Sequence, residues 1–303
     1  MEQVQYQTIE NEQDIGQRLD NYLIRVLKGV PKSRIYRLIR SGELRVNKKR
    51  AKVSQRLEQH DVLRIPPIRM AEVNHTEMLL PKQLKDALTK AIIYEDEGLL
   101  VVNKPAGLAV HGGSGLKWGL IEAYRQLKSD FHFLELVHRL DRDTSGCLLL
   151  AKKSAVLKDL QAQWQAQQVA KIYWAICDSP WQGKPQLKVN VPLQKNILKS
   201  GERMVKVAKE GKSAVSHVHL LANQADACWL KVSIETGRTH QIRVHCQYLG
   251  HPIIGDEKYG RGKAQRLFLH AHKIKFKYKG ELKTFIAELD DDFQTAINQF
   301  EPK

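Results

Sequence analysis

The stretch 138–146 reads His138-Arg139-Leu140-Asp141-Arg142-Asp143-Thr144-Ser145-Gly146 and lies between two hydrophobic runs, residues 133–137 and 147–151. Short apolar runs with a polar turn between them predict two buried strands joined by a loop. Charged side chains are seldom fully buried unless they are paired. A loop with two carboxylates and two guanidinium groups, held on such a scaffold, therefore favours a functional site. The alternative is a solvated network of ion pairs, because structural networks also gather charges.

Length and charge limit the classes of protein that fit. The chain of 303 residues has room for one large or two modest domains. Its formal net charge of +16 predicts attraction to a polyanion, either nucleic acid or an anionic membrane. No apolar run approaches the roughly 20 residues of a spanning helix, and the first residues lack the layout of a secretory signal. The four cysteines are scattered without a Cys-x-x-Cys pair, which favours small buried side chains. We therefore expect a cytoplasmic protein that binds no membrane.

Residues 14–70 form a basic module. The segment between Pro31 and Gly42 predicts a helix. At about 100° per residue, one face of this helix is apolar and the other carries three arginines. A basic turn follows a short strand at residues 44–47. An arginine stripe on an isolated helix is usually a solvated face, but beside a basic turn it predicts binding to a nucleic-acid phosphate backbone. The residues expected to make these contacts are Arg34, Arg37, Arg40, Lys48, Lys49 and Arg50.

The rest of the chain divides into a linker and a larger domain. Prolines and polar residues without a clean period predict a linker at residues 71–88. Residues 89–303 alternate strand-like and helical segments, which predicts a second, α+β domain. The glycine-rich segment 103–113 fits neither the P-loop nor the dinucleotide fingerprint. The histidine pairs do not supply the three or four convergent ligands of a zinc site. We therefore expect no metal and no small-molecule cofactor.

Three motifs resemble those of the RluA-type pseudouridine synthases. They are the stretch 138–146, the Asn103-Lys104-Pro105-x-Gly107 segment, and Gly237-Arg238-Thr239-His240-Gln241-Ile242-Arg243. Residues 37–47 also resemble the S4 RNA-binding domain. The resemblance covers about residues 14–290 and is closest to the RluC subgroup, whose members modify uridines of bacterial large-subunit ribosomal RNA. It implies a small S4-like RNA-binding domain followed by a mixed, mainly antiparallel-sheet catalytic domain, an α+β protein.

The resemblance also implies roles for four residues. Asp141 would be the catalytic carboxylate, and Arg243 would form an ion pair with it. Tyr173 would stack on the target base, and Arg139 would occupy the space that the flipped base leaves. Isomerising uridine breaks a C–N bond and forms a C–C bond without redox change or an energy source, in agreement with a chain that lacks nucleotide and metal motifs. We expect an RNA pseudouridine synthase that acts as a monomer on 23S ribosomal RNA.

Two other classes of function stay open. A non-enzymatic RNA chaperone with an S4 domain would bind RNA but would not need Asp141, Tyr173 or Arg243 at these positions. A glycosidase or nucleosidase would use Asp141 and Asp143 as a carboxylate pair about 5–9.5 Å apart and would release free base.

The chain also departs from the RluC subgroup between residues 259 and 265, where its connection is shorter. The target uridines are therefore not predicted.

Overall fold

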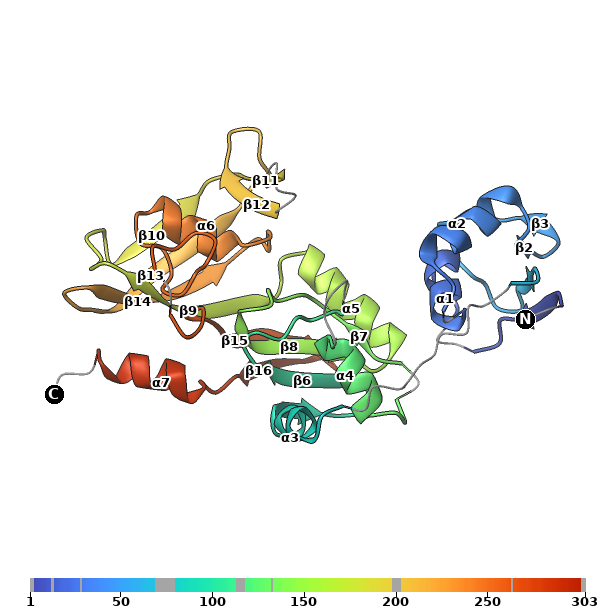
Figure 1. The fold of residues 1–303 in the computed structure, drawn as a ribbon, viewed down its shortest axis with the longest axis horizontal. Helices are drawn as coiled ribbons and strands as arrows, with labels where there is room; N and C mark the ends of the chain where they lie inside the picture. The colour runs from blue at the N-terminus through green and yellow to red at the C-terminus, as the bar shows by residue number, and fades with distance from the viewer. Residues whose placement is uncertain are drawn as a thin grey trace. The chain divides into compact units, whose positions relative to one another are not determined.

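The chain consists of two compact units, Met1–Leu79 and Leu80–Lys303 (Figure 1). The computed structural model describes residues 3–11, 14–27, 29–68, 80–112, 118–131, 133–197, 203–262 and 264–300. The predicted linker at residues 71–88 extends too far along the chain. Helix α3 (Lys82–Lys90) begins inside it and places Leu88 in the core of the second unit, which compensates the cost of ordering this segment. Residues 71–79 of that linker lie outside the described residues.

The first unit packs two helices against a small antiparallel sheet with the strand order β1-β4-β2-β3. As predicted, helix α2 ends at Gly42, which has a φ of 78° and closes the helix in the left-handed conformation that favours glycine. The predicted basic turn is shifted, because Asn47 and Lys48 form the turn while Lys49 and Arg50 belong to a strand. The elements are β1 (Gln5–Thr8), α1 (Leu19–Val26), α2 (Lys32–Ser41), β2 (Arg45–Val46), β3 (Lys49–Arg50) and β4 (Val62–Ile65).

The second unit is built on a ten-stranded mixed sheet. Eight strands follow the order β10-β13-β14-β9-β15-β8-β6-β5, while β16 pairs with β15 and β7 pairs with β8. The β8–β15 pair is parallel, and the other described pairs are antiparallel. The strands are β5 (Ile92–Glu95), β6 (Leu99–Lys104), β7 (Glu135–Leu136), β8 (Ser145–Ala151), β9 (Ala170–Asp178), β10 (Gln186–Asn190), β13 (Val215–Asn223), β14 (Ala227–Ile234), β15 (Leu269–Tyr278) and β16 (Glu281–Ile286). A separate hairpin contains β11 (Leu193–Ile197) and β12 (Arg203–Val207).

Helices cover both faces of this sheet. The remaining helices are α4 (Leu120–Leu127), α5 (Ser154–Gln165), α6 (Gln241–Tyr248) and α7 (Asp291–Asn298). Alternate residues of β6 and β8 enter two different cores, one with α3 and α4 and the other with α5. Burial on both faces explains why these strands are continuous apolar runs in the sequence. All four cysteines are buried and free, as predicted.

The polar stretch 138–146 connects β7 to β8, and its last residue requires glycine. Gly146 has a φ of 109° and lies opposite Ala271 of β15 in the parallel pair. A Cβ atom at this position would lie 2.4 Å from the Ala271 carbonyl oxygen. Because no side chain occupies this space, β15 approaches the loop closely and joins the two halves of the sheet beside it.

We expect Gly146→Ala to lower the free energy of unfolding of the second unit by about 2–3 kcal/mol, through both backbone strain and the clash with Ala271. Gly107→Ala is the matched control, because Gly107 has a φ of 80° but open space around its Cβ position. Urea titrations followed by tryptophan fluorescence measure this unit alone, since all five tryptophans lie in it. Equal losses in the two variants would show that the clash contributes nothing.

Candidate active site

A cavity of about 100 Å³ lies beside the 138–146 loop. Its lining includes Arg139 and Asp141 of the loop, Tyr173 of β9 and Arg243 of α6. The structure therefore brings together all four residues that the sequence placed at the site, although they are separated by up to about a hundred positions in the chain. A single water molecule needs only about 10–15 Å³, so this cavity has room for one small planar ring.

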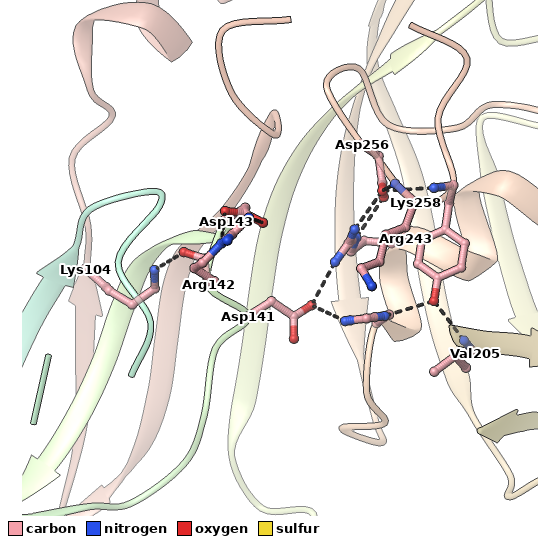
Figure 2. Close-up of polar contacts among 10 residues, drawn as sticks. Lys104, Asp141, Arg142, Asp143, Val205, Arg243, Asp256 and Lys258 are labelled. Atoms are coloured by element: carbon pink, nitrogen blue, oxygen red, sulfur yellow. Dashed lines mark hydrogen bonds and ion pairs between the residues drawn. The ribbon is translucent and has the colours of Figure 1, made fainter. Parts of the chain in front are cut away.

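Asp141 and Arg243 face each other across the edge of this cavity (Figure 2). The Arg243 Nη1 atom lies 3.7 Å from Asp141 Oδ2. The Asp141 side chain is 30% exposed, whereas that of Arg243 is only 6% exposed. The carboxylate is thus open to the cavity, and the guanidinium group that stabilises its negative charge comes from the protein interior.

The stronger partner of Arg243 is Asp256, which the sequence analysis did not single out. Arg243 Nε and Nη2 donate to the two carboxylate oxygens of Asp256 at 2.7 Å each, a bidentate pair. Asp256 Oδ1 also accepts from the backbone N–H groups of Lys258 and Tyr259. Burial alone would raise the pKa of Asp256, but these hydrogen bonds hold it below its usual range. The pair therefore stays ionised at neutral pH and fixes the Arg243 fork, with its third nitrogen toward Asp141.

His240 is a second neighbour of Asp141 that the sequence analysis left without a role. Its Nε2 atom lies 3.9 Å from Asp141 Oδ2, and its Nδ1 atom lies 2.9 Å from the Tyr259 hydroxyl. That hydroxyl accepts from the Val205 backbone N–H at 2.9 Å and can donate its own proton to Nδ1. Burial lowers the pKa of His240, which favours the neutral ring. When Nδ1 accepts the Tyr259 proton, the single proton of the neutral ring is on Nε2, which faces Asp141.

His240 also determines how helix α6 begins. In the sequence, Thr236 and Thr239 are the candidate caps of this helix, but neither caps it. His240 precedes the helix with a φ of 53°, and no side chain caps the helix. The Thr236 hydroxyl instead donates to Gln241 Oε1 at 2.8 Å. A non-glycine residue in the left-handed region is uncommon and often occurs at functional sites.

Lys104, at the end of β6, anchors the 138–146 loop through a hydrogen bond. Its side chain is fully buried, and its Nζ atom donates to the carbonyl oxygens of Pro105, Leu108 and Arg142 at 2.8, 2.8 and 2.7 Å. The bond to Arg142, shown in Figure 2, ties β6 to the residue after Asp141. Burial lowers the pKa of Lys104 to about 7. The Asn103–Gly107 motif therefore contributes an anchor for the loop.

The other charged groups of the loop lie away from the cavity. The His138 ring stacks on Trp164 with 4.5 Å between ring centroids, and its Nε2 accepts from the Leu149 N–H. Burial lowers the pKa of His138 to about 3, so the ring stays neutral. Asp143 forms an exposed ion pair with Arg142 and does not line the cavity. Among the charged side chains of this loop, only Arg139 and Asp141 line it.

Ser145 anchors the end of the loop to β15. The His270 Nε2 donates to the Ala287 carbonyl, so its Nδ1 accepts from the Ser145 hydroxyl at 2.8 Å. Arg266 Nη2 in turn donates to Ser145 Oγ at 2.6 Å. Burial lowers the pKa of His270 to about 4. The network therefore requires a neutral histidine.

The burial of His270 predicts that the free energy of unfolding depends on pH. Between pH 6.5 and about 4 the unfolded chain binds a proton at His270 that the folded chain does not bind. The free energy of unfolding should therefore fall as the pH decreases through this window, by about 2 kcal/mol between pH 7 and pH 5 from this group alone. The His270→Asn variant keeps an acceptor for Ser145 but does not titrate. Urea titrations at both pH values should show a smaller loss for the variant, and equal losses would contradict the assignment.

The residues expected to contact RNA all lie in the first unit. Arg37 and Arg40 are exposed on α2, and Lys48 and Lys49 are exposed on the β2–β3 hairpin. Arg34 is half-buried on α2, and Arg50 donates a hydrogen bond to the Arg40 carbonyl. The hydrogen bond joins the hairpin to the end of the helix, so the two basic segments form one continuous surface.

Within the residues that the structure describes, no three histidine, cysteine, aspartate or glutamate side chains are grouped as a metal site would need. In the same part of the chain, none of the helices has the length and apolar character needed to cross a membrane.

Comparisons with known proteins agree with this geometry. A profile of the family described as RNA pseudouridylate synthase matches residues 98–248, and one of the S4 domain matches residues 17–63. The ribosomal large subunit pseudouridine synthase C of Pasteurella multocida is 48% identical over 298 residues, which cover 95% of this chain and 91% of that protein. The protein of the same description from Escherichia coli K12 is 46% identical over 299 residues, covering 94% and 93%. The structure of human RNA pseudouridylate synthase domain containing 4 has a TM-score of 0.61 and 25% identity, and the match covers 72% of this chain and 95% of that chain.

Proposed function

The chain belongs to the RNA pseudouridylate synthase family, and on that basis we propose that it isomerises specific uridines of large-subunit (23S) ribosomal RNA to pseudouridine, with Asp141 as the catalytic carboxylate. The observation that carries this proposal is a ring-sized cavity with one carboxylate at its edge, which is paired with a buried arginine. A chaperone that only bound RNA would have no use for this arrangement.

The reaction needs an ionised carboxylate next to the base and the sugar, as a nucleophile or as a stabiliser of charge. Asp141 would lose its hydration when a flipped base closes the cavity, which disfavours its charged form. Arg243 opposes this effect, and Asp256 holds the Arg243 guanidinium in place. Asp141 therefore meets the target base as a carboxylate, the form that either role requires.

The target base must leave its stack to reach the cavity, at a cost of a few kcal/mol. Stacking on Tyr173 offsets about 1–3 kcal/mol of this cost. Arg139 is exposed and has no ion pair among the described residues, so it is available to enter the space that the base leaves. The proposed substrate, ribosomal RNA, places the enzyme in the cytoplasm.

The direct test is incubation of the purified chain with transcribed 23S ribosomal RNA, followed by detection of pseudouridine by carbodiimide labelling and primer extension. We expect conversion at specific uridines without release of free uracil. Release of uracil would indicate a nucleosidase, and binding without any conversion would indicate an RNA chaperone. Comparing ribosomal RNA from cells with and without the protein would identify the target uridines.

The basic surface of the first unit should contribute to RNA binding through phosphate contacts. We expect the double variant Arg37→Gln, Arg40→Gln to reduce the slope of log affinity against log salt by about 1.4–1.8, because each phosphate contact contributes about 0.7–0.9. The turnover rate at saturating RNA should not change. The control is Arg18→Gln, Arg25→Gln, which removes the same charge from guanidinium groups already paired with Asp20 and Asp14. Equal slopes for the two double variants would contradict the proposal for this surface.

A further inference from the structure

The outer face of the sheet in the first unit carries one aligned row of side chains. The strand register places Tyr6 of β1 opposite Arg64 of β4, and Arg64 opposite Arg45 of β2. Arg45 in turn lies opposite Arg50 of β3. The neighbouring residues Leu63 and Val46 are buried in the core, so this row points away from it. One aromatic ring and three guanidinium groups therefore cross all four strands on the exposed side.

The charges in this row are not compensated within the unit. Like charges directly opposite each other on adjacent strands are destabilising. Among the described residues, Arg45, Arg50 and Arg64 form no ion pair with a carboxylate, and their hydrogen bonds go to backbone carbonyl oxygens. An arrangement that costs stability and leaves three positive charges in a row is suited to a polyanionic partner.

Three members of the row, Tyr6, Arg45 and Arg64, line a groove of about 1010 Å³, roughly ten times the volume of the cavity beside Asp141. Its other charged lining residues are Lys48 and Glu43, so the groove carries a net positive charge. Tyr6 is 69% exposed, although a tyrosine ring gains stability from burial. Val62, also exposed on this face, adds apolar surface beside the ring. A basic groove with an accessible aromatic ring is how proteins bind single-stranded nucleic acid, because phosphates follow the charges and bases stack on the ring.

This groove is continuous with the basic surface of helix α2. Arg50, at one end of the row, donates to the carbonyl oxygen of Arg40 at the end of that helix. The path of positive charge therefore runs along α2, passes the hairpin and continues across the sheet to Tyr6.

We propose that a single-stranded segment of the RNA substrate follows this path over the outer face of the sheet, and that one of its bases stacks on Tyr6. This inference rests on the proposed function only for the identity of the partner as RNA. It assigns the first unit a preference for unpaired RNA, which phosphate contacts alone would not give.

The test measures the affinity of the full chain for a short fluorescent oligouridylate and for a duplex RNA of the same length. Tyr6→Ala should weaken binding to the oligouridylate by about tenfold, as expected for the loss of one stacked base. Binding to the duplex should change less than twofold. Tyr6→Phe keeps the ring and should bind as the unchanged chain does. Gln7→Ala is the positional control, because Gln7 is exposed on the same strand but belongs to the other face.

Arg64→Gln should also lower the salt slope for the oligouridylate by about 0.7. Unchanged affinity of Tyr6→Ala for the oligouridylate, or an equal loss in Gln7→Ala, would overturn the proposal. Its failure can be distinguished from failure of the proposed function. A chain that binds oligouridylate through Tyr6 but never forms pseudouridine refutes only the function, and a chain that forms pseudouridine but ignores Tyr6 refutes only this inference.

Discussion

Asp141→Asn is expected to reduce the formation of pseudouridine to less than about 10⁻⁴ of the wild-type rate, while RNA affinity changes little. The substitution keeps the size of the side chain but removes its negative charge, and loss of an essential nucleophile costs other enzymes as much as about 10⁶-fold. Single-turnover conversion of saturating ribosomal RNA measures the chemical step apart from binding. Turnover by the variant at a rate near that of the wild type would end the assignment of Asp141.

The matched control is Asp143→Asn, two positions along the same loop. Asp143 pairs with Arg142 on the exposed side and does not line the cavity. We therefore expect at most a severalfold change in rate. If the two variants lost activity equally, a mechanism with two carboxylates would be favoured, and the products should then be examined for free uracil.

Asp256→Asn should have the largest effect on stability, a loss of about 3–5 kcal/mol in the free energy of unfolding. Asparagine can still accept the backbone N–H groups of Lys258 and Tyr259, but it leaves the buried Arg243 charge with only the more distant carboxylate of Asp141. Activity should also fall by about 10²-fold, because Arg243 is no longer oriented toward Asp141.

A double variant separates the two effects. Arg243→Met, Asp256→Asn removes the unpaired charge and should regain most of the lost stability, since apolar groups often replace buried ion pairs without cost. Its activity should stay low, because no guanidinium group faces Asp141. Urea titrations of the four combinations give the coupling energy. Recovery of activity together with stability would show that Arg243 serves the fold alone.

The sequence predicts much of the fold and four residues that line the cavity, but not the neighbours Asp256 and His240. The apolar runs of β6 and β8 and the helix between Pro31 and Gly42 follow directly from local pattern. The family resemblance and the α+β class that it implies are confirmed. The start of α7 also follows from local pattern, because the Asp290 side chain accepts from the Phe293 N–H there.

Other features could not be predicted because they depend on distant contacts. Asp256 lies in a turn between two glycines, where an aspartate usually caps the turn itself. Only the folded chain shows that this turn meets Arg243. The available signal for this turn in the sequence was Gly255-Asp256 followed by Tyr259-Gly260. This segment comes after the motif that ends in Arg243. Similarly, β1 is exposed on all four residues, so it has no apolar period that would reveal a strand.

The position of β15 determines when the site can exist during synthesis. In the sheet this strand lies between β8 and β9, yet the ribosome makes it more than a hundred residues after β8. A nascent chain that includes Arg243 but not Tyr278 contains the proposed site residues without the strand that joins the two halves of the sheet. The first unit needs no such late segment, because its described strands and helices all lie within the first 68 residues. A growing chain can therefore complete its RNA-binding unit well before its chemistry is assembled.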